Sequence, residues 1–291
     1  MIGVCYAISK AMPAKTTQAQ TQTETEIMTE VETTGPEKGS LVIVGGGGAG
    51  TEILNKFIDL AGGPEAHIVV IPTAAGRPSY DQDAGIASKL RDLGAKKVSV
   101  IHTDDSKEAD SEDFVQTLKD AGGVWFGGGR QWRLVDSYAG TKSEAAFWDV
   151  LNRGGVIGGS SAGATIQGSY LARGDTKNNQ TMMGDHEAGF GFIKNIAIDQ
   201  HVLARNRQFD LFNILDKKPE LLGIGLDEKT AIIVQKDQFE VMGPSYVLVY
   251  DQQFWSREGS DLKQLPPNNQ MFYFLRAGDR YDMKKRAMIL K

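Results

Sequence analysis

Residues 156–164 read Val-Ile-Gly-Gly-Ser-Ser-Ala-Gly-Ala, a short apolar run that ends directly in a cluster of small residues. A β-branched run favours a buried strand, and the glycines that follow allow a sharp turn into a helix. Residues 159–163 match the pattern G-x-S-x-G, which raises a serine hydroxyl above the end of a strand. Because glycines flank the pair, Ser161 fits the position of a nucleophile better than Ser160. The alternative is that either serine only caps the helix.

Apolar runs and amphipathic stretches alternate on both sides of this turn. Runs typical of strands buried on both faces lie at Leu41–Val44, Ile68–Ile71, Val98–Ile101, Val124–Phe126 and Val156–Ile157. Helical stripes lie between them, namely Ile53, Leu54, Phe57 and Ile58; Phe114, Val115, Leu118 and Ala121, opened by Asp110 or Ser111; and Phe147, Val150 and Leu151. The alternation predicts an α/β fold in which a mostly parallel sheet is sandwiched between helices.

The two ends of the chain differ from this pattern. After about Ile224 the runs at 231–234, 239–242, 246–250 and 271–275 predict antiparallel strands that extend the edge of the sheet. We therefore expect one α/β domain over residues 41–291. Residues 1–40 are expected to be a disordered tail and linker, because Lys15–Ser40 is rich in Thr, Gln and Glu. The weakly apolar start fits a remnant of an export signal or a plain tail equally, so the compartment is left open.

The composition excludes several classes of protein. The 291 residues contain one cysteine, Cys5, so there is no intrachain disulfide and no cysteine-based metal cluster. No apolar run approaches the roughly 20 residues that a membrane span needs. The balance of 32 Lys and Arg against 37 Asp and Glu argues against a basic nucleic-acid surface. Since no histidine pair has the spacing of metal ligands, we expect neither a metal nor an organic cofactor.

Two further glycine clusters follow predicted strands, at residues 45–50 and 127–129. The carboxyl ends of parallel strands share one edge of a sheet, where active sites form. The first cluster superficially suits a dinucleotide site, but the next strand ends in Ile71-Pro72-Thr73 without the acidic residue that such a site needs. We therefore interpret this cluster as backbone packed closely around a shared site.

A serine nucleophile needs a base, usually histidine, and four histidines are available. His67 leads into a strand, His102 ends one, and His186 lies in a glycine-bearing loop. His201 follows an apolar run and stands within Asp199-Gln200-His201, with Arg205 and Arg207 just beyond, which is too polar for an ordinary core. An acid to orient the imidazole is offered by Asp227 or Glu228, and the alternative is that both are surface turn residues.

Together these segments resemble the cyanophycinase branch of the serine peptidases that also include aspartyl dipeptidase. The resemblance covers nearly all of residues 41–291. It is carried by G-S-S-A-G-A at 159–164, F-G-G-G-R-Q at 126–131, D-Q-H at 199–201 with R-N-R at 205–207, and G-I-G-L-D-E-K-T at 223–230. It implies the three-layer, flavodoxin-like fold of class I glutamine amidotransferases.

The resemblance also implies the residues of the site. The triad would be Ser161, His201 and Glu228, a chain order that argues against the α/β-hydrolase fold. The oxyanion would be bound by the backbone amides of Gly129 and Ala162. The residues implied for the substrate pocket are Gln131, Asp199, Gln200, Arg205 and Arg207. Members of this family are often dimers, so a homodimer is one expectation, although no apolar stripe in the sequence marks an interface.

Cyanophycinases cut cyanophycin, a polyaspartate that bears arginine on each side chain, and release β-aspartyl-arginine. Two residues depart from the family pattern. Arg130 stands where an acid commonly precedes the pocket glutamine, and Asp210 replaces a third pocket arginine. Arg205 and Arg207 can hold a substrate carboxylate, whereas Asp199 can hold a substrate guanidinium or neutralise those arginines.

Three functions follow from these residues. The first is a peptidase that acts on cyanophycin. The second is a related peptidase for another aspartyl or isoaspartyl peptide, because the exchange of a cation for an anion at position 210 changes charge matching. The third is a non-catalytic binding protein on the same fold. A glutamine amidotransferase is disfavoured, because Ser161 stands where that class has its cysteine.

Overall fold

The computed structural model describes residue 1, residues 33–257, residue 267 and residues 270–290. Most of the expected linker lies outside the described residues. Its last part is held in place: the amide of Thr34 donates to Asp237 Oδ1 at 2.7 Å and that of Gly35 to the carbonyl of Lys236 at 2.8 Å. Ser40 already belongs to the first strand. The folded unit therefore begins before the boundary expected at residue 41.

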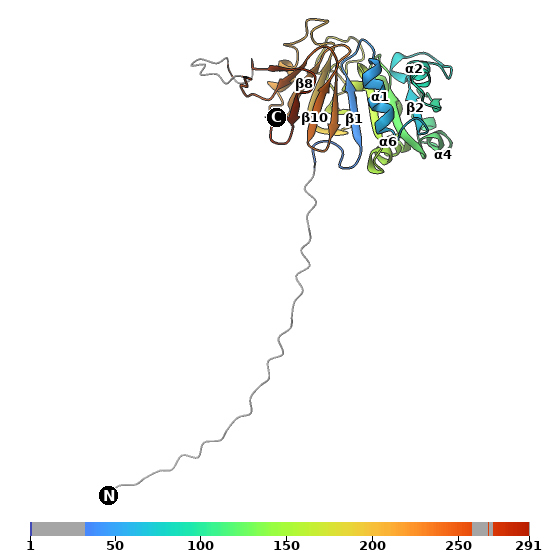
Figure 1. The fold of residues 1–291 in the computed structure, drawn as a ribbon, viewed down its shortest axis with the longest axis horizontal. Coiled ribbons are helices and arrows are strands. Elements are labelled where there is room, and N and C mark those ends of the chain that lie inside the picture. Colours follow the sequence, from blue (N-terminus) through green and yellow to red (C-terminus); the bar gives the residue numbers. More distant parts are fainter. Residues whose placement is uncertain (2–32, 258–266, 268–269, 291) are drawn as a thin grey trace. The chain divides into compact units, whose positions relative to one another are not determined.

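Nine strands of the described residues form the larger sheet, in the order β14-β13-β10-β9-β1-β5-β4-β2-β3. Its parallel core contains β1 (Ser40–Val44), β5 (Val156–Ser160), β4 (Ala121–Phe126), β2 (His67–Ile71) and β3 (Lys97–Val100). The antiparallel part contains β9 (Ala231–Gln235), β10 (Gln238–Met242), β13 (Arg280–Asp282) and β14 (Ala287–Ile289). Figure 1 shows this order along the sheet, from β10 through β1 to β2.

A second sheet of five strands, in the order β12-β11-β8-β7-β6, was not expected from the sequence. It contains β6 (Gly168–Tyr170), β7 (Ile193–Gln200), β8 (Leu222–Leu226), β11 (Val247–Tyr250) and β12 (Tyr273–Leu275). Strands β6, β7 and β8 run parallel, whereas β11 and β12 are antiparallel. The expectation that all the C-terminal strands extend one edge is therefore correct for β9 and β10 and wrong for β11 and β12.

Helices cover the larger sheet on both faces. The α-helices are α1 (Thr51–Leu60), α2 (Ala87–Asp92), α3 (Ser106–Ala109), α4 (Glu112–Val115), α5 (Trp132–Tyr138), α6 (Lys142–Asn152), α7 (Ala162–Thr165) and α8 (Phe212–Leu215). The described residues also contain the 3₁₀ turns η1 (Thr73–Ala75) and η2 (Gln116–Leu118). The stripe expected over Phe114–Ala121 is helical only as far as Leu118, because Ala121 already begins β4. Of the two expected caps, the Ser111 side chain accepts a hydrogen bond from the amide of Phe114.

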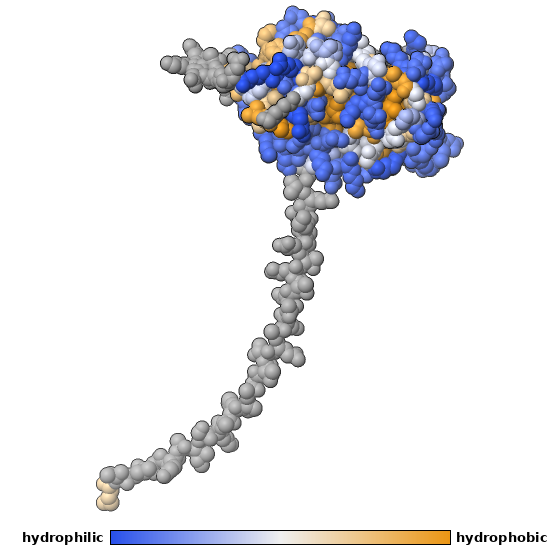
Figure 2. Space-filling view, in the orientation of Figure 1, coloured by the Kyte–Doolittle hydropathy of each residue, from blue (hydrophilic) through white to orange (hydrophobic). Residues whose placement is uncertain are grey.

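Alternate residues of the parallel strands face two different cores. Val42, Val44 and Trp125 pack with Phe57 of α1 in one hydrophobic cluster. Leu41 and Ile43, which point the other way, share a larger cluster with α5, α6 and the second sheet. The second sheet therefore packs on the opposite face of the larger sheet from α1, and it brings the ends of β7 and β8 to the edge where β1 and β5 end. Figure 2 shows hydrophilic residues over much of the visible face of the folded part, with hydrophobic residues between them.

Candidate active site

Ser161 occupies a strained turn between β5 and α7. Its backbone has φ 58° and ψ −110°, a conformation that is uncommon for a residue with a Cβ. The flanking glycines make the turn possible, since a Cβ on Gly159 would lie 2.2 Å from the carbonyl oxygen of Gly163. A Cβ on Gly163 would lie 2.1 Å from the carbonyl oxygen of Phe126. The sequence G-x-S-x-G thus forms the sharp turn predicted for it.

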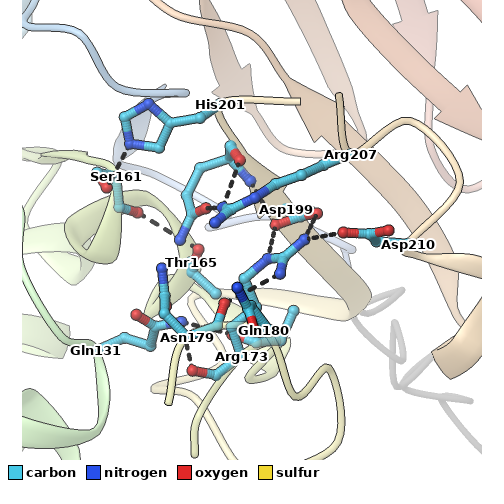
Figure 3. Close-up of polar contacts among 12 residues, drawn as sticks. Gln131, Ser161, Thr165, Arg173, Asn179, Gln180, Asp199, His201, Arg207 and Asp210 are labelled. Atoms are coloured by element: carbon cyan, nitrogen blue, oxygen red, sulfur yellow. Dashed lines mark hydrogen bonds and ion pairs between the residues drawn. The ribbon is translucent and has the colours of Figure 1, made fainter. Parts of the chain in front are cut away.

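The Ser161 hydroxyl faces a histidine. Its side chain makes no capping hydrogen bond to α7, so the alternative of a capping serine does not describe this residue. Ser161 Oγ lies 2.9 Å from Nε2 of His201. Figure 3 shows the two side chains pointing toward each other.

His201 and Glu228 come from the ends of neighbouring strands, β7 and β8. The imidazole is buried, and its Nδ1 lies 2.6 Å from Oε1 of Glu228, whose side chain is 35% exposed. The amide of His201 donates to the carbonyl of Gly45 at 2.9 Å. The amide of Lys229 donates to the carbonyl of Gly46 at 2.7 Å. The turn after β1 is therefore hydrogen-bonded to His201 and to the residue that follows Glu228.

The first glycine cluster lies directly against this pair. A Cβ on Gly46 would lie 2.1 Å from Cε1 of His201, and a Cβ on Gly47 would lie 2.7 Å from Oε2 of Glu228. Both glycines have positive φ values, 124° and 66°. Close backbone packing around a shared site, which we preferred to a dinucleotide loop, is confirmed.

Asp227, the other acid considered for this role, points elsewhere. Its Oδ1 accepts hydrogen bonds from the amides of Leu203 at 3.1 Å and Ala204 at 2.9 Å, and its Oδ2 accepts one from Ser245 Oγ at 2.6 Å. Burial opposes ionisation, but these hydrogen bonds outweigh it and lower the pKa of Asp227. Asp227 therefore fixes the turn that follows His201, and Glu228 is the acid within reach of the imidazole.

The environment of His201 favours the neutral form of its imidazole. Burial lowers its pKa, the positive charges of Arg205 and Arg207 lower it further, and the hydrogen bond with Glu228 opposes them without reversing the direction. A neutral imidazole can accept a proton, which is the form that a general base needs.

Two backbone amides are available beside the serine. Within the described residues, the amides of Gly129 and Ala162 donate no hydrogen bond to the protein. The turn that carries Gly129 lies against Ser161, since a Cβ on the neighbouring Gly128 would be 3.4 Å from Ser161 Cβ. Gly129 itself has φ 146°, and a Cβ there would lie 2.0 Å from the carbonyl oxygen of Ala74. Free amides in such a place can stabilise an oxyanion.

The expected pocket residues differ in their burial and in their hydrogen-bond partners. Gln200 is buried and accepts a hydrogen bond from Arg207 Nη1 at 2.9 Å, while Arg205 is exposed and no described acid lies within ion-pair distance of it. Gln131 is completely buried, and its Nε2 donates to the carbonyls of Ala172 at 2.7 Å and Arg173 at 2.9 Å.

Asp199 has a partner that the sequence did not suggest. Two nitrogens of Arg173 bind its carboxylate at 2.7 and 2.9 Å, and both residues are buried. Arg173 Nη2 also donates to Asp210 Oδ2 at 2.6 Å (Figure 3). In this structure the ion pair of Asp199 is therefore with Arg173 and not with Arg205 or Arg207. Arg173 lies 26 residues before Asp199, in a connection with no motif, so no sequence spacing pointed to it.

The remaining histidines have other partners. His67 contacts Asp120 and Ser99, each at 2.8 Å, and His102 contacts Thr73 Oγ1 at 2.8 Å. His102 lines a separate cavity of about 330 Å³ between η1 and α5. Partial burial opposes protonation of His186, yet hydrogen bonds with Asp185 and Asp136 raise its pKa. Of the four histidines, His201 alone lies beside Ser161 in the described part of the chain.

The described residues show neither a metal-binding cluster nor a membrane-spanning helix. No group of three or more His, Cys, Asp or Glu side chains among the described residues is arranged to hold a metal ion. In the same part of the chain, no helix has the length and apolar character to cross a bilayer.

Comparisons with known proteins agree on one family. Residues 41–242 match the model of peptidase family S51. The cyanophycinase of Geminocystis herdmanii is 32% identical over 259 residues, which cover 85% of this chain and 94% of that protein. The cyanophycinase of Nostoc sp. is 28% identical over 277 residues, covering 89% and 91%. The crystal structure of a peptidase from an acI-B1 actinobacterium has a TM-score of 0.63 at 25% identity and covers 85% of this chain and 98% of that one.

Proposed function

Since the chain belongs to peptidase family S51 and is a serine peptidase, we propose that Ser161, His201 and Glu228 are its catalytic triad. The single observation that carries this proposal is the pair of short contacts through the imidazole, 2.9 Å to Ser161 and 2.6 Å to Glu228. Serine, base and orienting acid within hydrogen-bond reach form the arrangement that activates a hydroxyl.

The reaction would proceed through an acyl-enzyme. His201 Nε2 takes the proton of Ser161 Oγ as the oxygen attacks the scissile carbonyl, and Glu228 stabilises the imidazolium by accepting its Nδ1–H. The amides of Gly129 and Ala162 bind the tetrahedral oxyanion. His201 then gives its proton to the leaving amine. A water molecule, deprotonated by His201, hydrolyses the ester and restores the serine.

The substrate would be an aspartyl or β-aspartyl peptide, with cyanophycin as the first choice. The named relatives are cyanophycinases. Arg207 is half-buried and Arg205 exposed, and no described acid lies within ion-pair distance of either. Two such cations can hold a substrate carboxylate through charge-assisted hydrogen bonds.

A second candidate is an isoaspartyl peptidase that takes a different substrate. It is favoured by Asp210, which stands where the family pattern has an arginine and which forms an ion pair with Arg173. Two acids and one arginine then form one cluster at Asp199, so the charge around this residue differs from the pattern. The homodimer expected from the resemblance is not needed by either candidate, because each triad residue comes from one chain.

The test is to incubate the full chain with cyanophycin and with a panel of isoaspartyl dipeptides, while monitoring the release of β-aspartyl-arginine by chromatography. We expect Ser161→Ala to reduce hydrolysis roughly 10⁴- to 10⁶-fold, because the nucleophile is lost. Turnover of the panel without cyanophycin would support the second candidate. Near-normal turnover by the Ser161 variant would exclude Ser161 as the nucleophile.

A further inference from the structure

The turn that carries Gly129 is held at both ends by carbonyl groups that follow one strand. The amide of Gly127 donates to the carbonyl of Ile71, the last residue of β2, at 2.9 Å. The amide of Arg130 donates to the carbonyl of Ala74, in η1, at 2.8 Å. A Cβ on Gly129 would lie only 2.0 Å from the oxygen of Ala74, so the backbone of Gly129 lies directly against that carbonyl. The place of the Gly129 amide therefore depends on the place of the Ala74 carbonyl.

An arginine side chain binds the same carbonyl. Arg133 Nη1 donates to the oxygen of Ala74 at 3.0 Å. Arg133 lies in the first turn of α5, and its own amide donates to the carbonyl of Arg130 at 3.2 Å. The Ala74 oxygen thus accepts one bond from the turn and one from the helix that follows the turn. A charged donor makes the stronger kind of hydrogen bond.

The guanidinium of Arg133 has a close-fitting place beside this carbonyl. A Cβ on Gly76 would lie 2.2 Å from Arg133 Nη1 and 2.3 Å from its Cζ. Gly76 also has a φ of 68°, which suits glycine. Arg133 Cζ lies 5.2 Å from the centroid of the Trp132 ring, within the range of a cation–π contact. The absence of a side chain at position 76 therefore lets the guanidinium reach the Ala74 oxygen.

We propose that Arg133 is a positioning residue for the oxyanion site, because it holds the Ala74 carbonyl against which the Gly129 turn lies. The inference rests on the proposed function, in which the Gly129 amide binds the oxyanion. Arg133 acts through Ala74 and is assigned no contact with the substrate. The oxyanion forms only as the serine attacks, so a displaced amide weakens binding of the transition state and not of the substrate.

Two variants break the bond to Ala74 in different ways. Arg133→Ala removes the donor, whereas Gly76→Ala keeps the arginine and puts a methyl group where its guanidinium lies. Complete loss of an oxyanion donor costs about 100- to 1,000-fold in kcat, and a displaced donor loses part of that effect. We expect each variant to lower kcat about tenfold and to change KM less than about twofold. Steady-state kinetics and the rate at which a fluorophosphonate labels Ser161 measure the effect.

Each variant has a matched control. Arg77→Ala makes the same change of charge, and Arg77 is an exposed residue that lines the same cavity of about 330 Å³ as Arg133. Gly191→Ala introduces a Cβ at the same φ of 68°, where it meets nothing within 4 Å. Both controls should retain the wild-type kcat and labelling rate. Thermal unfolding of all four variants shows whether each is folded, and Gly76→Ala decides alone if Arg133→Ala does not fold.

Hydrogen exchange tests the positioning without a substrate. The Arg130 amide donates to Ala74, so it should exchange faster in Arg133→Ala and in Gly76→Ala than in the wild-type chain. Unchanged exchange of this amide would overturn the inference.

The kinetic outcomes separate the two proposals. An unchanged kcat in a folded Arg133→Ala or Gly76→Ala chain, or an equal loss in its control, would overturn the role of Arg133. A rise in KM as large as the fall in kcat would do the same, because it would show damage to substrate binding. If the wild-type chain cleaves none of the peptides and its Ser161 is not labelled, the proposed function itself fails. If wild-type Ser161 is labelled and Arg133→Ala reacts equally fast, the role of Arg133 alone fails.

Discussion

At the scale of single residues, three residues with strained backbone surround the point where the three side chains meet. Ser161, His201 and Lys229 have φ values of 58°, 55° and 58°, in the region that residues with a Cβ rarely adopt. Each lies at the end of a strand, and the amide of each donates to a residue between Val44 and Gly46. The turn after β1 therefore holds the nucleophile, the base and the residue after the acid in strained conformations.

Gly46 gives the sharpest test of this packing. A Cβ there would lie 2.1 Å from the imidazole, whereas a Cβ on Gly48 would meet nothing within 4 Å. We expect Gly46→Ala to reduce kcat roughly hundredfold by displacing His201. Gly48→Ala is the matched control, since φ is positive at both positions and each variant bears about 1–2 kcal/mol of backbone strain. If kcat is the same in Gly46→Ala and Gly48→Ala, the close approach of Gly46 does not hold His201 in position.

The lowered pKa of His201 predicts the acid side of the pH profile. Because the base must be neutral, kcat/KM should rise with pH through an apparent pKa below 6.5, the ordinary histidine value, and then level off. Arg205→Gln removes a cation whose field lowers that pKa, so the rise should move to higher pH. Lys97→Gln, which makes the same charge change at the start of the edge strand β3, away from the carboxyl ends of the strands, should leave it in place. If the rise of kcat/KM moves to lower pH in Arg205→Gln, or moves equally in Arg205→Gln and in the control variant, His201 is not the base.

Protonation of His201 also affects the free energy of unfolding. The direction of this effect follows from the lowered pKa of His201. The pKa of the folded state lies below that of the unfolded chain, so the unfolded state binds the proton more readily. The contribution of this residue is present above about pH 6.5 and is lost as the pH falls from there through the lower pKa of the folded state.

At the scale of elements, the site depends on how β7 and β8 end. Asp227 links the two ends, because it follows β8 and accepts hydrogen bonds from the turn after β7. We expect Asp227→Ala to lower stability by about 1–3 kcal/mol, since two amides and the Ser245 hydroxyl lose their acceptor. It should also lower kcat on the order of tenfold, because His201 loses its fixed position.

Asp227→Asn is the control for that change. Its Oδ1 can still accept from Leu203 and Ala204, so it should retain most of the stability and of kcat. Thermal unfolding and steady-state kinetics measure both quantities. If the alanine variant unfolds earlier but turns over substrate at the wild-type rate, Asp227 supports the fold without positioning His201.

The sequence predicted the elements of the larger sheet better than those of the second sheet. The parallel strands are continuous β-branched runs between amphipathic helices, a pattern that indicates both the strand and its environment. The second sheet is built from β6, which has three residues, and from strands whose partners lie far along the chain. Apolar periodicity identifies a strand but not its neighbour, so β11 and β12 were assigned to the wrong sheet.

At the scale of the whole molecule, the two sheets share one hydrophobic cluster, which includes Ile43 of β1, Ile198 of β7 and Ile224 of β8. This packing places the ends of β7 and β8 beside those of β1 and β5, which positions the site. Glycine-rich strand ends and one histidine in polar surroundings let the sequence predict Ser161 and His201, whereas the acidic turn left Asp227 and Glu228 open and only the resemblance chose Glu228. Arg173 was missed, because it reaches Asp199 through tertiary packing of a connection that has no motif.

The start of the folded unit leads to a prediction about truncation. The described contacts at this end begin at Thr33 and include bonds from Thr34 and Gly35 to the turn between β9 and β10. We expect a chain that begins at residue 33 to retain wild-type activity and melting temperature. A chain that begins at residue 38 loses those bonds and should melt several degrees lower, because each hydrogen bond contributes about 1 kcal/mol. Loss of activity on removal of residues 1–32 alone would contradict this boundary.

The central claim is that Ser161, His201 and Glu228 work together as a triad, and it is tested most directly by reaction with a fluorophosphonate followed by peptide mass mapping. We predict one equivalent of label on Ser161 in the folded wild-type chain. We predict far slower labelling in His201→Ala and no labelling of the urea-unfolded chain. A folded, active enzyme that is not labelled at Ser161, or is labelled there equally fast without His201, would contradict the account.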